Sequence, residues 1–270
     1  MCVIPVCGAV AGDLVCLVMR TVLEIRNLAL GYPELPLFRG LSMDIEPGSI
    51  LAVLGANGSG KSTFVKMLLG LLQPLAGKLN WPEGRPSEIG YLAQMTEFDR
   101  RFPIRVRDLV AMGAWQGFGF HGRLDKANRE RVDAALEAAG VLDIANRSLH
   151  TLSGGQLQRT LFARVIMQDA PLILLDEPFA AVDQNTEAHL LTFIRKWREE
   201  GRAVVLVVHD LSSVLDYCSH ALLLGAETAT YGSVEAVVTP ERLIAQNYLS
   251  ASQAEWMFRS AGSTAEHAHV

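Results

Sequence analysis

Short apolar runs alternate with helix-periodic segments along the middle of the chain, and this pattern predicts a mixed α/β fold. Three runs are almost wholly apolar, as expected for strands, at residues 50–54, 172–175 and 204–208. A helix is predicted at 63–72, directly after the first run, and another at 185–200, between the other two. The last two runs and the helix between them therefore predict a β–α–β unit.

Residues 20–53 and 78–93 have shorter apolar runs that are interrupted by glycine and proline. Alternation of apolar and polar positions is typical of strands with one face in solvent, and Gly and Pro mark the turns between them. We expect these two segments to form an antiparallel β lobe that packs against the α/β core.

The pattern from about residue 96 to 158 is helical. Apolar residues recur at i, i+3, i+4 and i+7 in this segment, at Val132, Ala135, Leu136 and Ala139. Gly140 then supplies a stop signal. We expect a helical subdomain at about 96–158, and near the C-terminus a helix from about 241 that is followed by a polar tail.

Composition narrows the class of protein. The chain has 270 residues, half of them hydrophobic, so it can bury a sizeable core. No apolar stretch reaches the roughly 18 residues that a membrane-spanning helix needs. The net charge of −5, without a block of like charges, argues against nucleic acid as the main partner. The four cysteines match no zinc pattern, and we expect a reduced, cytosolic protein.

The first 18 residues are apolar but lack the basic start of a signal peptide. The alternating pattern of an edge strand begins at Met19. We interpret residues 1–18 as a non-native or dispensable extension, with translation starting at Met19.

A glycine-rich loop follows the first buried run. Residues 55–63 fit the pattern G-x-x-x-x-G-K-[ST] between a predicted strand and a predicted helix. Such glycines let consecutive N–H groups surround an anion, and the helix N-terminus adds its positive dipole. Lys61 can reach the β- and γ-phosphates of a nucleotide, and the Ser62 hydroxyl can bind Mg²⁺. The residues expected to hold the nucleotide phosphates are Gly55, Asn57, Gly58, Ser59, Gly60, Lys61, Ser62 and Thr63.

Two carboxylates end the second buried run. A carboxylate at a strand end beside a phosphate loop is where Mg²⁺ needs a ligand, so Asp176 is the candidate. Glu177 is the next residue and points elsewhere, where it can polarise an attacking water. Together with the phosphate loop, these acids predict nucleoside triphosphate binding and hydrolysis.

The chain has a second glycine motif, which distinguishes among the protein families that share the phosphate loop. Residues 152–159, Leu-Ser-Gly-Gly-Gln-Leu-Gln-Arg, resemble the signature motif of ATP-binding-cassette (ABC) ATPases, and the two acids follow about 20 residues later. The chain also has residues resembling the family's adenine-stacking aromatic, Q-loop glutamine, D-loop aspartate and switch histidine, at Tyr32, Gln94, Asp183 and His209. Because all these motifs stand in family order, the chain is identified as a member of the ABC ATPases.

The resemblance implies an α/β fold: a P-loop NTPase (RecA-like) core with an antiparallel β lobe and an inserted α-helical subdomain. It implies an ABC ATPase domain at 19–250, a C-terminal tail at 251–270, and ATP with Mg²⁺ as cofactors. It also implies that two cassettes pair head to tail as a homodimer. The residues with which one cassette would complete the ATP site of the other are Ser153, Gly154, Gly155 and Gln156.

The same resemblance implies a role for each site residue. Lys61 holds phosphates, Glu177 is the general base and His209 contacts the γ-phosphate. Tyr32 stacks on adenine. The residues that serve Mg²⁺ and the water are Ser62, Asp176 and Gln94.

The work that ATP drives is interpreted as transport. The 58 residues from 95 to 152 suffice for a compact helical lobe but not for the long coiled coil of repair and chromosome ATPases. Members that act in translation usually carry two cassettes, and here there is one. We expect the ATP-hydrolysing subunit of a bacterial importer, peripheral on the cytoplasmic face of the inner membrane. Its partners are a membrane permease and, indirectly, a solute-binding protein.

Two segments indicate which substrate is transported. Residues 176–187 and 98–113 resemble those of zinc and manganese importer cassettes, and by analogy the second docks the permease. Iron-chelate and cobalamin importers share part of this segment and are the alternative, with a soluble non-transport ABC ATPase as the remaining one.

Overall fold

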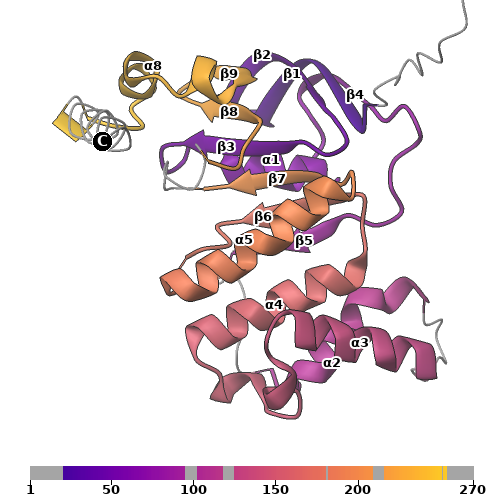
Figure 1. Ribbon diagram of the computed structural model, residues 1–270. Coiled ribbons are helices and arrows are strands. Elements are labelled where there is room, and N and C mark those ends of the chain that lie inside the picture. The colour runs from indigo at the N-terminus through magenta and orange to yellow at the C-terminus, as the bar shows by residue number, and fades with distance from the viewer. Residues whose placement is uncertain are drawn as a thin grey trace, which may run out of the picture.

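The computed structural model describes residues 21–94, 102–117, 125–180, 182–208, 216–250 and 252–253 (Figure 1). The predictions for residues 1–18, for residues 98–101, for His209 and for most of the C-terminal tail lie outside the described residues.

A six-stranded sheet forms the centre of the molecule, in the order β5-β6-β7-β3-β8-β9. Its strands are β3 (Ile50–Gly55), β5 (Gly90–Leu92), β6 (Leu172–Asp176), β7 (Ala203–Val207), β8 (His220–Leu224) and β9 (Ala229–Ser233). The first five in this order are parallel, and β9 pairs antiparallel with β8. Every residue of β3, β6 and β7 is buried, as continuous apolar runs predict for strands covered on both faces.

A smaller antiparallel sheet has the order β2-β1-β4. It consists of β1 (Leu23–Tyr32), β2 (Leu35–Ile45) and β4 (Ala76–Asn80). The predicted β lobe is therefore confirmed, but its predicted extent is wrong at both ends. Residues 50–53 and 90–92 belong to the parallel sheet, because β3 pairs with β7 and β8, and β5 pairs with β6.

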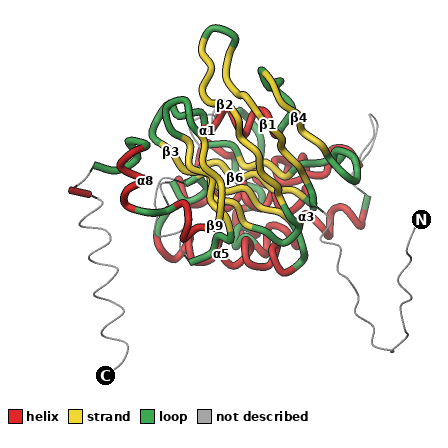
Figure 2. The backbone as a smooth tube through the Cα atoms, turned by 90° about the horizontal axis from the view of Figure 1, so that it is seen from above, coloured by secondary structure: helices red, strands yellow, loops and turns green. Residues whose placement is uncertain are grey.

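Helix α1 (Lys61–Leu68) lies between the two sheets (Figure 1). Its buried Phe64 and Leu68 share one apolar cluster with the small sheet and with alternate residues of the large sheet, such as Leu51 and Val53. In the view from above (Figure 2), the strands of the small sheet lie over those of the large sheet. The helix begins two residues before its predicted start and ends before Gly70, which has a left-handed φ of 75°.

Four helices in the described part of the segment between β5 and β7 lie on the other side of the large sheet, the last two of them near its strands and the first two farther out (Figure 1). They are α2 (Val106–Ala111), α3 (Lys126–Ala138), α4 (Gly154–Gln168) and α5 (Gln184–Glu199), with 3₁₀ turns at Met112–Gly117, Leu142–Ile144 and Leu149–Thr151. They enclose a second apolar cluster with the opposite set of strand residues, such as Ile50 and Ala52. The predicted β–α–β unit is confirmed as β6–α5–β7, with both strands parallel and adjacent.

Two features of the C-terminal third go beyond the predicted elements. The antiparallel pair β8–β9 and the short α7 (Val234–Val237) have no counterpart among them. The helix expected from about residue 241 is α8 (Pro240–Ala245). None of the helices in the described ranges is both long and apolar enough to cross a bilayer.

Candidate functional site

The glycine-rich loop joins the C-terminal end of β3 to the start of α1, as predicted. Gly55 and Gly60 have φ values of 154° and 103°, which L side chains rarely adopt. A Cβ atom on Gly55 would lie 2.3 Å from Ser59 Oγ and 2.5 Å from the Leu224 carbonyl oxygen. The loop therefore has no room for a side chain at this position.

The helix that follows this loop has no side-chain cap. Gly60 is the N-cap residue of α1, so no side-chain oxygen accepts from the first N–H groups of the helix, and its first turn contains no acid. Asn57 and Gly58 are exposed at the loop tip, and Ser62 is exposed at the second helical position. Such a loop and helix start can bind an anion through backbone N–H groups.

Lys61 is held inside the loop. Its side chain is 7% exposed, and Nζ donates to the carbonyl oxygens of Gly55 (2.7 Å) and Ala56 (3.1 Å). Burial lowers the pKa of Lys61, whereas the nearby carboxylates of Glu177 and Asp176 raise it. The phosphate loop and the two predicted acids are thus brought together, although more than 100 residues separate them in the sequence.

The two acids lie at the end of β6, and both carboxylates are close to Lys61. Asp176 is the last strand residue and is buried. Glu177 turns out of the strand with a φ of 51°, a left-handed conformation that costs a non-glycine residue about 1–3 kcal/mol. Its N–H donates to the Val207 carbonyl oxygen (3.1 Å), and its Oε2 accepts from Gln94 Nε2 (2.7 Å). The Gln94 amide is therefore in contact with the Glu177 carboxylate, as expected if both residues belong to one site.

Tyr32 lies at the end of β1, in a tight hairpin with β2, and its side chain is half exposed. A Cβ on Gly31 would lie 2.6 Å from the Leu35 carbonyl oxygen, so the hairpin closes only with glycine there. Leu37 of β2 packs against the phosphate loop, because a Cβ on Gly60 would lie 2.8 Å from Leu37 Cδ1. Leu37 is not among the predicted site residues, since nothing in its local pattern separates it from other strand leucines.

The signature residues form the start of α4. Ser153 is the N-cap residue: its Oγ accepts from Gln156 N (3.2 Å), and its N–H donates to Gln156 Oε1 (3.0 Å), which is a capping box. A Cβ on Gly155 would lie 4.0 Å from Asp183 Oδ2, so the signature adjoins the start of α5. Helices α4 and α1 pack on opposite faces of the large sheet, so the signature and the phosphate loop come from different layers.

Asp183 is the N-cap residue of α5. Its carboxylate accepts from Thr186 N (2.8 Å) and Thr186 Oγ1 (3.0 Å), and these bonds lower the pKa of Asp183. The aspartate is therefore anionic and fixed in orientation next to Gly155.

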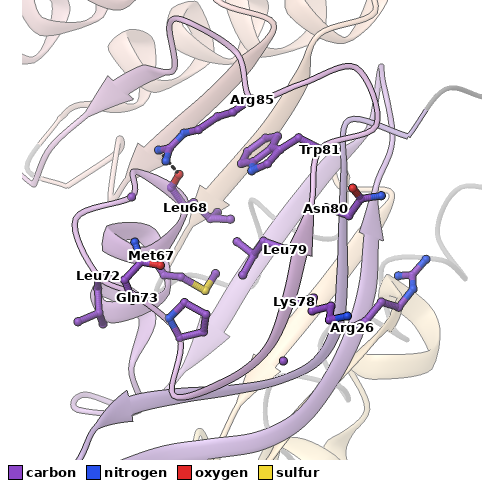
Figure 3. Close-up of a pocket in the computed structure, with 13 residues that line it drawn as sticks. Arg26, Met67, Leu68, Leu72, Gln73, Lys78, Leu79, Asn80, Trp81 and Arg85 are labelled. Carbon is purple, nitrogen blue, oxygen red and sulfur yellow. Dashed lines mark hydrogen bonds between the residues drawn. The ribbon is translucent and has the colours of Figure 1, made fainter.

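A hollow of about 680 Å³ lies at the other end of α1, away from Lys61 (Figure 3). The Arg85 guanidinium donates to the Leu68 carbonyl oxygen (3.1 Å) and lies 5.9 Å from the centroid of the Trp81 ring. Arg85 thus satisfies a carbonyl group at the C-terminal end of α1. None of the predicted site residues lines this hollow.

Comparison with known proteins decides the family. The family model for the ABC transporter ATP-binding domain, described as "ABC transporter", matches residues 38–180, which span the phosphate loop, the signature and the two acids. The chain belongs to the ABC transporter ATP-binding proteins.

Two relatives and one solved structure show how far the similarity of this ABC protein extends. It is 36% identical over 225 residues to the manganese transport system ATP-binding protein MntB of Bacillus subtilis, covering 82% of this chain and 90% of the relative. It is 34% identical over 223 residues to the zinc transport system ATP-binding protein TroB of Treponema pallidum, with coverages of 81% and 84%. An inward-facing ABC transporter assigned to the metal-chelate type is 32% identical, with a TM-score of 0.77 and coverages of 85% and 90%.

These similarities confirm the predicted fold class and activity. The chain is the ATP-binding subunit of an ABC transporter and hydrolyses ATP. Subunits of this family work as dimers together with membrane permease components.

Proposed function

We propose that this ABC subunit energises the uptake of manganese or zinc by a bacterial importer. The observation that carries the proposal is the 36% identity to a manganese system subunit over four fifths of the chain. The zinc system relative at 34% identity supports the same class of cargo. A chelated metal is the second candidate, because the similar solved transporter is of metal-chelate type.

Within the site, the proposed role of Lys61 follows from its contacts. Two neutral carbonyl oxygens now accept from Nζ, and nucleotide phosphates would offer it anionic acceptors, which form stronger hydrogen bonds. The N–H groups of residues 58–63 hold the same phosphates, and Tyr32 presents its half-exposed ring to adenine. His209, outside the described residues, is proposed to contact the γ-phosphate.

The donor set beside Lys61 fits Mg²⁺, which prefers carboxylate, hydroxyl and carbonyl oxygens. Asp176 is buried at the strand end with its charge close to Lys61, and Ser62 is the second residue of the adjoining helix. We assign the ion to Ser62, Asp176 and Gln94. When bound, Mg²⁺ would neutralise phosphate charge.

Glu177 is proposed as the general base. The Gln94 amide donates to one oxygen of its carboxylate, and the left-handed backbone takes Glu177 out of the strand that ends at Asp176, which supports different tasks for the two neighbouring acids. The carboxylate takes a proton from the attacking water while Lys61 and the loop stabilise phosphate charge.

The site is proposed to be completed by a second copy in a two-fold pair. The start of α4 offers the N–H groups of Gly154 and Gly155, which the capping box does not use, and the Ser153 hydroxyl, and these suit a γ-phosphate held by the partner's loop. Ser153, Gly154, Gly155, Gln156 and Asp183 would then meet the partner's nucleotide. A homodimer follows, because this chain carries every motif itself.

The permease is proposed to dock near residues 98–113, where Phe102 is 61% exposed and Met112 is 47% exposed. This places the subunit at the cytoplasmic face of the membrane, with a solute-binding protein acting on the other side. We propose the ABC ATPase domain at 19–250, with its helical subdomain at about 96–158.

Uptake measurements test the transport proposal. Cells that express the chain with its own permease and solute-binding protein are given radioactive Mn²⁺ or Zn²⁺, and the control is Lys66→Ala, an exposed lysine on the same helix as Lys61. We expect uptake with the wild type and Lys66→Ala and none with Lys61→Ala. Uptake of a ferric chelate but of neither free ion would establish the second candidate instead.

A further inference from the structure

Gln158 is a polar side chain in the core, on the second turn of α4. It is 1% exposed, and its Nε2 donates to the Pro178 carbonyl oxygen at 2.5 Å. Its Oε1 is buried and has no hydrogen-bond partner in the part of the chain that the structure describes. Burying a half-satisfied amide disfavours folding, so an apolar residue of the same length would suit the core better. The position of this amide therefore calls for another explanation.

The group that Gln158 holds is the peptide carbonyl next to the proposed general base. Pro178 follows Glu177 directly and has no N–H of its own, so its carbonyl oxygen is its one backbone group able to hydrogen-bond. Other hydrogen bonds also fix this turn, among them Glu177 N to Val207 O (3.1 Å), Ala180 N to Glu177 O (3.1 Å) and Gln94 Nε2 to Glu177 Oε2 (2.7 Å).

Among the residues that hydrogen-bond to this turn, Gln158 is the one on α4, the helix that begins with the signature motif. The other partners lie on β7, on the turn itself and just after β5, whereas Gln158 lies five residues after Ser153 on α4. The first turn of the same helix approaches this region again, where Gly155 adjoins Asp183. A shift of the N-terminal end of α4, where the signature lies, would therefore displace the Pro178 carbonyl group, which is one residue from Glu177.

We propose that Gln158 is a positioning residue that couples the signature helix to the carboxylate of Glu177 in the same chain. The inference rests on the proposed function, namely Glu177 as base and the signature as a contact to the partner's nucleotide. Nucleotide held by the signature in one site of the pair would, through Gln158, set the Glu177 geometry of the other site. This makes the two sites dependent on each other.

The test compares steady-state ATP hydrolysis by the purified full-length chain in five variants. Gln158→Met and Gln158→Glu remove the donor at nearly constant length. Thr160→Val is the matched control, since it removes a buried hydrogen bond (Thr160 Oγ1 to Gln156 O, 2.8 Å) from the same helix without touching Pro178. Glu177→Gln, alone and combined with Gln158→Met, is followed by release of labelled phosphate.

We expect kcat to fall about 10–100-fold in both Gln158 variants, as for a displaced catalytic group, with KM for ATP within about twofold. Thr160→Val should stay near wild type. In the Glu177→Gln background, Gln158→Met should cause no further loss.

Three results would overturn the inference. The first is a normal kcat in both Gln158 variants. The second is an equal loss with and without Glu177, which would show that Gln158 acts elsewhere. The third is a large loss in Gln158→Met while Glu177→Gln keeps its turnover, which would reject the proposed base as well. Whether the ATPase site as a whole is assigned correctly is tested separately, by measuring the turnover of Lys61→Ala.

Discussion

At the scale of single residues, the site depends on side chains whose surroundings change their chemistry. Lys61 is buried beside two carboxylates, and Glu177 is kept in a left-handed backbone conformation. Strained residues of this kind persist only where the surroundings fix them, and they gather at functional sites. Both residues were predicted from the sequence motifs, but their strain and burial were not.

The first prediction concerns Glu177. Glu177→Gln keeps the size of the side chain and removes its basicity, so turnover should fall by about 10²–10⁴-fold while ATP still binds. The measurements are phosphate release and nucleotide affinity, with the exposed Glu199→Gln as the control. Turnover near the wild-type value would remove Glu177 from the role of base.

The second prediction concerns Cys218, which is partly buried against the core. Burial raises the pKa of its thiol to about 12, so at pH 8 it remains protonated and a poor nucleophile. We expect slow alkylation of Cys218 by iodoacetamide in the folded protein and fast alkylation in urea, measured by mass spectrometry of its peptide.

The same shift fixes the sign of the pH effect on stability. Between the usual thiol pKa and about 12, the unfolded chain releases a proton that the folded chain retains. Cys218 therefore lowers the free energy of unfolding as pH rises through this window. Equal alkylation rates in the folded and unfolded protein would contradict the burial.

At the scale of elements, each motif sits where two elements meet. The phosphate loop ends β3 and begins α1, and the two acids end β6. Ser153 and Asp183 are N-cap residues of α4 and α5. The chemistry is therefore placed by element ends, whose orphan N–H groups and dipoles are available for binding.

The third prediction tests the loop. Gly55→Ala would place a Cβ 2.5 Å from the Leu224 carbonyl oxygen, so the loop must move and ATP affinity should fall by more than about tenfold, or 1.4 kcal/mol. Gly84→Ala is the control, because Gly84 has a φ of 84° with open space around it. We expect Gly84→Ala to keep wild-type nucleotide affinity; equal losses in both variants would mean that backbone strain alone is responsible.

The fourth prediction separates the two roles of Ser153. Aspartate caps helices about as well as serine, so Ser153→Asp should change stability by less than about 0.5 kcal/mol. Its negative charge would repel a partner's γ-phosphate, so hydrolysis should be lost. Ser233→Asp is the control at another cap, where Ser233 Oγ accepts from Ala236 N. If Ser153→Asp hydrolyses ATP normally, the signature does not face a phosphate.

At the scale of the whole molecule, the two glycine motifs of the chain lie on different layers. The phosphate loop, Lys61 and the acids form one cluster, and the signature lies on a helix that packs on the opposite face of the large sheet from α1. In the proposed two-fold pair, each ATP site takes one half from each copy.

The fifth prediction follows from this division. Lys61→Ala and Ser153→Asp chains should each be inactive alone. When they are mixed, half of the dimers are mixed pairs, and each mixed pair has one site with both halves intact. Turnover should then recover, to at most about a quarter of the wild-type value, because any coupling between the two sites lowers the activity of the single intact site. No recovery, although mixed dimers are shown by crosslinking, would exclude a head-to-tail site.

The sequence by itself determined the fold class and predicted the site residues, because the patterns that indicate both are local. Continuous apolar runs mark strands covered on both faces, and the glycine motifs require fixed spacings along the chain. The β6–α5–β7 unit was therefore predictable.

Only the tertiary structure decided which strands pair and what surrounds each group. Residues 50–53 and 90–92 joined the parallel sheet rather than the β lobe, because a short apolar strand fits either partner until the whole sheet is assembled. Likewise, the packing of Leu37 on Gly60 and the bond from Gln158 to Pro178 join segments about 20 residues apart. Contacts of this kind arise from packing in three dimensions, which no local pattern encodes.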